Sequence, residues 1–92
     1  MNPISLCIPR VDVSYKRETI KKIFENCLLG QIKKIDVVPN HKEKAKYNRV
    51  FVHFADMTCE HQCERLKNGG SIKIVYQEPW FWKCTLSRHA NS

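Results

Sequence analysis

The segment 47–54 places the strongest constraint on the fold, because its apolar residues alternate strictly with the residues between them. Val50, Val52 and Phe54 occupy every second position. Successive side chains of a β-strand point to opposite faces of the sheet, so these three residues would share one face. The side chains expected on the other face are those of Tyr47, Arg49, Phe51 and His53. The segment therefore predicts a strand that buries one face and leaves the other outside the core.

Two segments have the periodicity of amphipathic helices. The first runs from about residue 16 to residue 29, with apolar residues at spacings of three and four. Its expected inward stripe consists of Ile20, Ile23, Phe24, Cys27 and Leu28. We expect Ser14 to cap the start of this helix and Gly30 to end it. The second helix is predicted from about residue 58 to residue 67, and Asn68, Gly69 and Gly70 would stop it. Its expected inward face consists of Cys59, Gln62 or Cys63, and Leu66.

Four further apolar runs predict strands, over residues 5–9, 31–38, 71–76 and 80–86. Residues 77–79 form a turn signal, so the last two runs are expected to make a hairpin. In the last run, Trp82, Cys84 and Leu86 would face the core. Phe81, Lys83 and Thr85 would then lie on the opposite face, because the alternative register would bury the charge of Lys83.

The predicted order is strand, helix, strand, strand, helix, strand. We therefore predict an α+β fold, a ferredoxin-like βαββαβ sandwich with a four-stranded antiparallel sheet and two helices on one face. Ninety-two residues are enough for one domain, residues 1–92, with a core over about 4–88 and a frayed tail over 89–92. The sheet face without helices would be open to solvent, and function is expected there.

The charge balance favours a polyanionic partner. Sixteen Lys and Arg residues against nine Asp and Glu residues give a net charge of +7, and binding to phosphates releases condensed counterions. No apolar run approaches the ~20 residues of a membrane span, and the first residues lack the features of a signal peptide. We expect an intracellular protein, in the cytoplasm or nucleus, whose five cysteines are reduced.

Two predicted strands carry motifs that resemble those of the RNA recognition motif (RRM) family, and the resemblance covers nearly all of residues 4–87. The hexamer of the family falls on Leu6–Val11 and the octamer on Tyr47–Phe54. The family usually stacks bases on three exposed aromatic residues. This chain keeps Phe51, whereas Cys7 and Arg49 stand in the other two aromatic positions, and Asn48 replaces the octamer glycine. The stretch 72–83 is also similar to short RRM-like proteins of large DNA viruses, which implies a virion or the host cytoplasm as a location.

The resemblance implies single-stranded RNA as the partner, with bases lying across the open sheet. Phe51 would stack a base, with Arg49 and Tyr47 beside it on the same face. The remaining expected contacts are Cys7, His53 and Phe81 on the sheet, and Lys42, Lys44, Lys46 and Lys83 on phosphates. Each has a structural alternative. Phe51 could be a covered hydrophobic plug, Arg49 could be a solvated side chain or pair with Asp36, His53 could be a half-exposed structural residue, and the loop 41–46 could be simply solvated.

Other function classes receive less support from the sequence. A sheet with a depleted aromatic platform could instead bind a protein, with the residues around Trp80–Trp82 as anchor. An acylphosphatase-like enzyme would need a glycine-rich phosphate cradle after the first strand, and Pro9–Val13 has an arginine but no glycine. Cys59, His61 and Cys63 fall short of the four ligands of a zinc site. We expect a monomer that is not an enzyme and has no metal, cofactor or small-molecule substrate.

Overall fold

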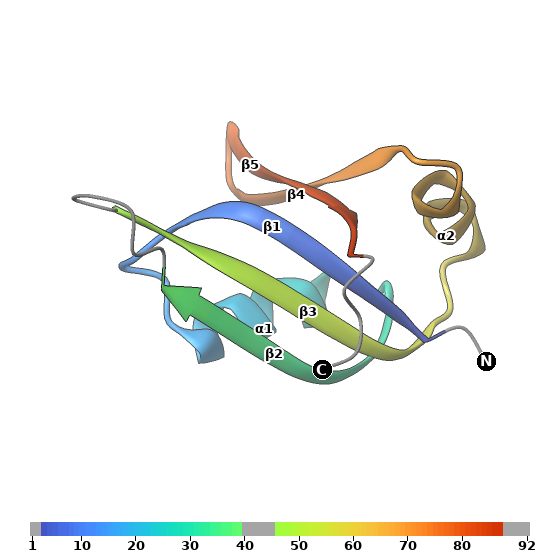
Figure 1. The fold of residues 1–92 in the computed structure, drawn as a ribbon, viewed down its shortest axis with the longest axis horizontal. Helices are drawn as coiled ribbons and strands as arrows, with labels where there is room; N and C mark the ends of the chain where they lie inside the picture. Colours follow the sequence, from blue (N-terminus) through green and yellow to red (C-terminus); the bar gives the residue numbers. More distant parts are fainter. Residues whose placement is uncertain (1–2, 40–45, 88–92) are drawn as a thin grey trace.

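The strands of the chain form one antiparallel sheet, in a computed structural model that describes residues 3–39 and 46–87. The elements in chain order are β1 (Ile4–Asp12), α1 (Arg17–Asn26), β2 (Gly30–Pro39), β3 (Tyr47–Met57), α2 (Glu60–Lys67), β4 (Ser71–Gln77) and β5 (Trp80–Leu86). In the sheet the strand order is β2-β3-β1-β5-β4, with β1 in the centre. Figure 1 shows α1 behind β1, β2 and β3 and α2 at one end of the sheet.

The predicted four-stranded ferredoxin-like sheet is wrong, because the sheet has five strands. The hairpin predicted from residues 71–76 and 80–86 is confirmed, but its first arm is itself an edge strand of the sheet, which pairs with β5 from Ser71↔Thr85 to Gln77↔Trp80. The predicted strand order leaves this arm out of the sheet. The two arms are joined by the two-residue turn at Glu78 and Pro79, with one register shift between Val75 and Gln77. Ile72 on β4 is buried like its partner Cys84. The coarser prediction of an α+β fold with an antiparallel sheet is confirmed.

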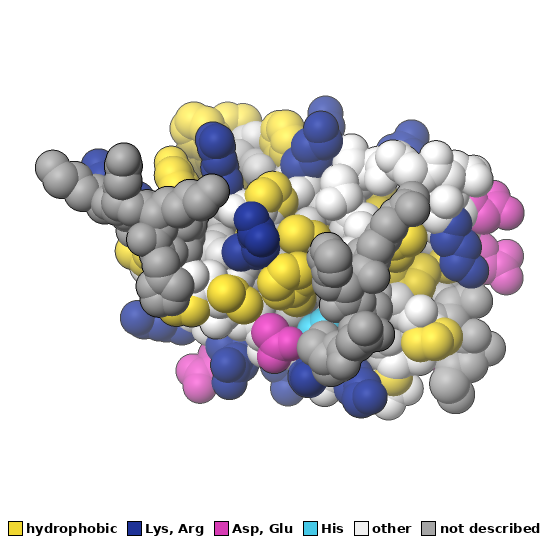
Figure 2. All heavy atoms as spheres, viewed as in Figure 1, with side chains coloured by type: hydrophobic (Ala, Val, Ile, Leu, Met, Phe, Trp, Pro, Cys, Tyr) yellow, Lys and Arg dark blue, Asp and Glu magenta, His cyan; other side chains and the backbone are white. Residues whose placement is uncertain are grey.

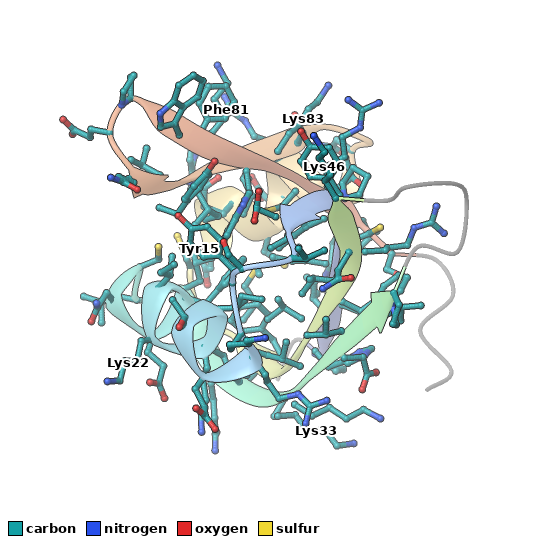
Figure 3. The ribbon with its side chains drawn as sticks, turned by 90° about the vertical axis from the view of Figure 1, so that its left-hand side faces the viewer. Tyr15, Lys22, Lys33, Lys46, Phe81 and Lys83 are labelled. Carbon is teal, nitrogen blue, oxygen red and sulfur yellow. The ribbon has the colours of Figure 1, made fainter. Side chains whose placement is uncertain are left out.

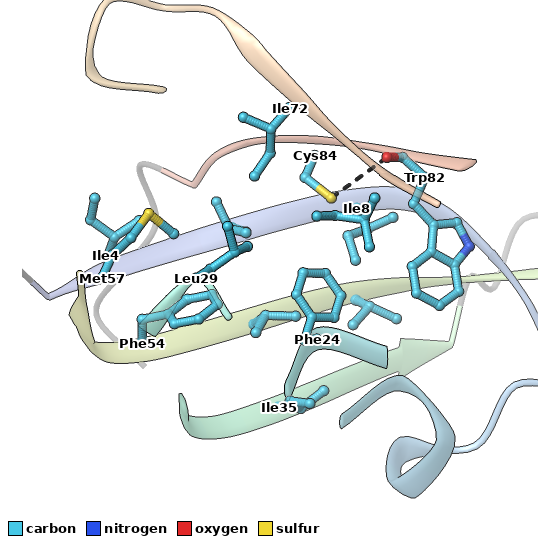
Figure 4. Close-up of a cluster of buried hydrophobic side chains, with 14 of the residues drawn as sticks. Ile4, Ile8, Phe24, Leu29, Ile35, Phe54, Met57, Ile72, Trp82 and Cys84 are labelled. Carbon is cyan, nitrogen blue, oxygen red and sulfur yellow. Dashed lines mark hydrogen bonds between the residues drawn. The ribbon is translucent and has the colours of Figure 1, made fainter. Parts of the chain in front are cut away.

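The core lies on one face of the sheet, between the strands and both helices (Figure 4). The alternation predicted for β3 is confirmed, since Val50, Val52 and Phe54 are all buried. The helices contribute their own buried side chains to the same cluster, which are Ile20, Phe24, Cys63 and Leu66. The opposite face of the sheet has neither helix packed against it.

Trp82 is the centre of an aromatic cluster that joins the β4–β5 hairpin to α1. Its ring stacks on Tyr76 at 4.5 Å between centroids and on Phe24 at 6.1 Å. Tyr15 meets it edge-on at 5.5 Å. The predicted register of β5 is confirmed, because Trp82 is 3% exposed whereas Phe81 is 45% exposed.

The first helix is shorter than predicted, which changes the role of three residues around it. It ends at Asn26, and Leu28 then adopts a left-handed conformation (φ 55°) and is 82% exposed, so its place in the inward stripe was wrong. Leu29 is buried instead. Gly30 begins β2 rather than ending the helix, and a Cβ there would overlap the backbone at Asp56. The helix starts after Lys16 without a side-chain cap, so the predicted cap at Ser14 was also wrong.

The second helix ends where the sequence predicted, with Asn68 as its C-cap and Gly69 in a left-handed conformation. Neither helix is long enough to cross a bilayer, and within the described ranges no helix has the length and apolar character of a membrane span.

Candidate nucleic-acid interface

The candidate site is the face of the sheet opposite the core, which we call the open face. Strand pairing places side chains from all five strands on it in rows, because paired residues point to the same side. Its described members are Ser5, Cys7, Lys34, Asp36, Val38, Arg49, Phe51, His53, Ser71, Lys73, Val75, Phe81, Lys83 and Thr85. Figure 2, which has the orientation of Figure 1, shows hydrophobic side chains along the middle of this face with Lys and Arg side chains around them.

Phe51 lies at the middle of the sheet, on β3. Its neighbours across the strands are Asp36 on β2 and Cys7 on β1, and the same row continues to Thr85 on β5. The ring is half-buried by these neighbours rather than fully exposed. One aromatic residue therefore offers part of its surface in the centre of a row whose other members are polar or small.

His53 is part of a hydrogen-bonded chain across three strands. Its Nδ1 lies 2.7 Å from the Ser5 hydroxyl oxygen on β1, and its Nε2 lies 2.9 Å from Asp36 Oδ2 on β2. An ionised carboxylate can only accept, so Nε2–H donates to Asp36, and Nδ1 shares the second hydrogen bond with the Ser5 hydroxyl. His53 is only 6% exposed. The structural alternative expected for His53 therefore fits better than base contact, although the ring is buried rather than half-exposed.

The same three residue types occur in serine hydrolases, but their arrangement here differs. In that chemistry the serine bonds to Nε2 of the histidine and the acid bonds to Nδ1. Here the two nitrogens have exchanged partners, and the hydroxyl of Ser5 is buried beneath the surface. The hydrogen bonds among Ser5, His53 and Asp36 therefore hold β1, β2 and β3 in register, and they do not present a nucleophile.

Arg49 is exposed at the edge of the open face, two residues before Phe51. The expected alternative, an ion pair with Asp36, is wrong, because that carboxylate binds His53 and lies 3.8 Å from Lys34 Nζ. Arg49 lies near Cys7 instead. Burial raises the pKa of the Cys7 thiol, and the positive charge of Arg49 opposes that rise. The guanidinium is thus available to a base or a phosphate from solvent.

Phe81 and two lysines form the other end of the open face, on the β4–β5 hairpin (Figure 3). Lys73 Nζ lies 4.8 Å from the centroid of the Phe81 ring, a cation–π distance. Lys73 and Lys83 are cross-strand partners, and Val75 is the partner of Phe81. The sequence prediction named Phe81 and Lys83 but missed Lys73 and Val75. The alternation of Ser71–Tyr76 could have found them, since Ile72 and Ile74 occupy the buried positions between them.

The predicted basic loop, residues 41–46, falls mostly outside the described residues. Lys42 and Lys44 lie outside the described residues. Lys46 is exposed at the start of β3, and its carbonyl oxygen accepts a hydrogen bond from the Val13 amide. Tyr47 is also exposed and pairs with Asp12 at the far end of β1. It lies four residues before Phe51 on β3.

All five cysteines are free thiols, as the sequence predicted. Cys63 is buried in the core, and burial raises the pKa of Cys84 to about 12. Within residues 3–39 and 46–87, no three His, Cys, Asp or Glu side chains lie close enough to hold a metal ion.

Comparison with protein-family models, with curated proteins and with solved structures gave no match to this chain.

Proposed function

We propose that this chain binds single-stranded RNA across the open face, as its resemblance to the RRM family implies. The observation that carries the proposal is the combination of two partly exposed phenylalanines, Phe51 and Phe81, with three cations, Arg49, Lys73 and Lys83. They lie on a sheet face that neither of the two described helices covers. Aromatic rings stack on bases of any sequence, and cations around them neutralise phosphates.

The charges on this face favour an anion. Among the described residues of the open face, Asp36 is the one carboxylate, and its nearest partners are His53 and Lys34. With three phosphate contacts, the logarithm of the RNA affinity should fall with the logarithm of salt concentration with a slope of about −2.

The two rings are too far apart for one base to contact both. Phe51 and Phe81 are separated by two strand spacings and four residues along β5, which amounts to roughly 16 Å at ~4.8 Å per strand and ~3.3 Å per residue. Stacked nucleotides rise about 3.4 Å each. A strand of about five or six nucleotides is therefore needed to reach both rings.

The test is a fluorescence-anisotropy titration of labelled single-stranded RNA, as a dinucleotide and as a hexamer, at low and at near-physiological salt. Phe51→Ala should weaken hexamer binding at least tenfold, since a stacked base contributes about 1–3 kcal/mol. Phe81→Ala should weaken binding of the hexamer more than binding of the dinucleotide.

Trp80→Ala is the matched control, because Trp80 is an exposed aromatic residue at the hairpin tip rather than on the open face. Its RNA affinity should equal that of the parent. The proposal would be refuted if RNA binding disappeared at physiological salt, or if Phe51→Ala left the RNA affinity unchanged. Either result would mean that the interaction comes from net charge alone.

A protein-interaction module is the second candidate, favoured by the β4–β5 hairpin. Trp80 is 63% exposed at the start of β5, and Val75 is 53% exposed on β4. The outer backbone groups of β4 face no other strand in the described sheet, because β4 is its edge strand. Trp and exposed sheet edges are both common in protein interfaces. For this function, Trp80→Ala would abolish partner binding while Phe51→Ala would not, and salt would have little effect.

A further inference from the structure

A hollow of about 210 Å³ lies between α1 and the edge strand β2, on the other side of β2 from the open face. Its lining consists of Arg17, Lys21, Ile32, Lys33, Lys34 and Ile35. Four of these six residues are basic and none is acidic. A water molecule occupies about 30 Å³ of the liquid, so the hollow has room for a small anion together with several waters.

Two local features of the chain bring these cations together. Arg17 and Lys21 are four residues apart on α1, which places them on one face of the helix. On β2, Ile32 pairs with Phe54 and Lys34 pairs with His53, so Lys33 is an extra residue in the ladder. Such a bulge redirects side chains, and here the extra residue Lys33 lines the hollow beside Lys34, whose ammonium group lies toward Asp36 of the open face.

The convergence of like charges is unfavourable unless an anion balances it. Cations four residues apart destabilise a helix. Of the four basic residues, only Lys34 has an ion pair among the described residues, at 3.8 Å from Asp36, and that carboxylate also binds His53 at 2.9 Å. Arg17, Lys21 and Lys33 have no carboxylate partner within the part of the chain that the structure describes. Ile32 and Ile35 form an apolar wall beside them, which reduces screening by water.

We propose that the hollow is a binding site for a phosphomonoester, either the terminal phosphate of a nucleic-acid strand or the phosphate of a free small molecule. A monoester carries a charge of about −1.5 to −2 at neutral pH and has three strong acceptor oxygens. A backbone diester carries one charge, so a site whose cations Arg17, Lys21 and Lys33 lack a carboxylate partner among the described residues favours the monoester. Arg17 can bind two of its oxygens with one planar guanidinium. This site lies away from Phe51 and Phe81 and does not depend on RNA binding at the open face.

Lys22 supplies a matched control for the lysines of the hollow. It is exposed and follows Lys21 on α1, but it does not line the hollow. Figure 3 shows Lys22 on the outer side of α1 and Lys33 well apart from it near β2. Replacing Lys22 by glutamine removes one charge from the same helix and leaves the site intact.

The experiment is a titration of amide chemical shifts with inorganic phosphate and with a nucleoside monophosphate. We expect saturable shifts confined to residues 16–22 and 31–36. The affinity should fall at least tenfold in the double variant Lys21→Gln/Lys33→Gln and remain within twofold of the parent in Lys22→Gln. Equal losses in both variants, or shifts spread over the whole surface without saturation, would overturn the proposal in favour of net charge alone.

A second arm distinguishes the two sources of the phosphate. RNA hexamers with a 5′-phosphate or a 5′-hydroxyl are compared by anisotropy in the parent and in the double variant. Tighter binding of the phosphorylated hexamer, lost in the double variant, assigns the site to a strand end. Equal binding of the two hexamers, with the nucleoside monophosphate still bound, assigns it to a small molecule. Phe51→Ala should leave phosphate binding unchanged, so failure at the open face and failure at the hollow give different results.

Discussion

The register of β5 decides which residues face the solvent, and the two tryptophans of that strand allow it to be tested. A shift of one residue would turn every side chain of the strand to the other face. Trp82 is 3% exposed and stacks on Tyr76 and Phe24, whereas Trp80 is 63% exposed. Replacing each by alanine removes the same atoms from two opposite environments on one strand.

The two substitutions should differ by several kcal/mol in the free energy of unfolding. Truncating a buried Trp to Ala costs about 3–5 kcal/mol, and a chain of this length has roughly 5–14 kcal/mol of stability in total. Trp82→Ala should therefore lower the free energy of unfolding by about 4 kcal/mol, or the melting temperature by about 15–30 °C. Trp80→Ala should change the stability by no more than about 0.5 kcal/mol.

Urea unfolding followed by circular dichroism measures both values. If Trp82→Ala does not fold, Trp82→Phe retains an aromatic ring in the stack and should lose about 2 kcal/mol. Trp80 and Trp82 lie two residues apart on the same side of the strand, so a one-residue shift would turn both to the other face. A loss at Trp82 as small as the loss at Trp80 would therefore refute the assigned register. The exposure of Phe81 and Lys83 on the open face would then be wrong as well.

Three further predictions concern a close backbone approach, the polar network and a buried thiol, and urea unfolding tests each of them. Gly30→Ala should lower the free energy of unfolding by about 3 kcal/mol, because the new Cβ would overlap the Asp56 carbonyl and lie 2.8 Å from Met57 Cα. Gly69→Ala has open space around it and should cost about 1–2 kcal/mol. Equal costs at the two glycines would contradict the close approach at Gly30. His53→Ala should cost about 2–3 kcal/mol by breaking two hydrogen bonds, more than Ser5→Ala, which breaks one; the reverse order would contradict the network. Burial raises the pKa of Cys84 from 9.0 to about 12, so above pH 9 the unfolded state releases a proton that the folded state keeps. Stability should then fall with rising pH by up to about 1.4 kcal/mol per unit until pH 12, and a Cys84→Ala variant with an equally steep loss would contradict the assignment.

The sequence predicted the elements whose burial pattern has a single interpretation. The alternation in Tyr47–Phe54 identified β3, and the cost of burying Lys83 selected the correct register for β5. The number of strands was mispredicted because sheet membership of Ser71–Gln77 depends on its pairing with β5 and not on its own composition. Leu28 was misplaced because a left-handed backbone ended the helical periodicity before it.

The sequence predicted which residues lie on the candidate site, but not which neighbours they contact. Strand periodicity placed Arg49, Phe51 and Phe81 on the face opposite the core. The burial of His53 depends on Ser5 and Asp36, which come from two other strands and carry no local signal. The basic hollow depends on the bulge at Lys33, and a one-residue shift between paired strands cannot be seen in either strand alone.

Asp36 lies between the two proposed binding sites and contacts one member of each. Its Oδ2 accepts from His53 at 2.9 Å and lies 3.8 Å from Nζ of Lys34, a residue that also lines the hollow. The shorter contact involves a buried ring, whereas the longer one joins two partly exposed side chains, and exposed ion pairs contribute little to stability. A phosphate in the hollow can therefore draw Lys34 away without disturbing the bond that fixes His53. Because the neighbours of Phe51 stay in place when that happens, the two sites should bind independently, and an RNA strand that engages both would gain affinity from each.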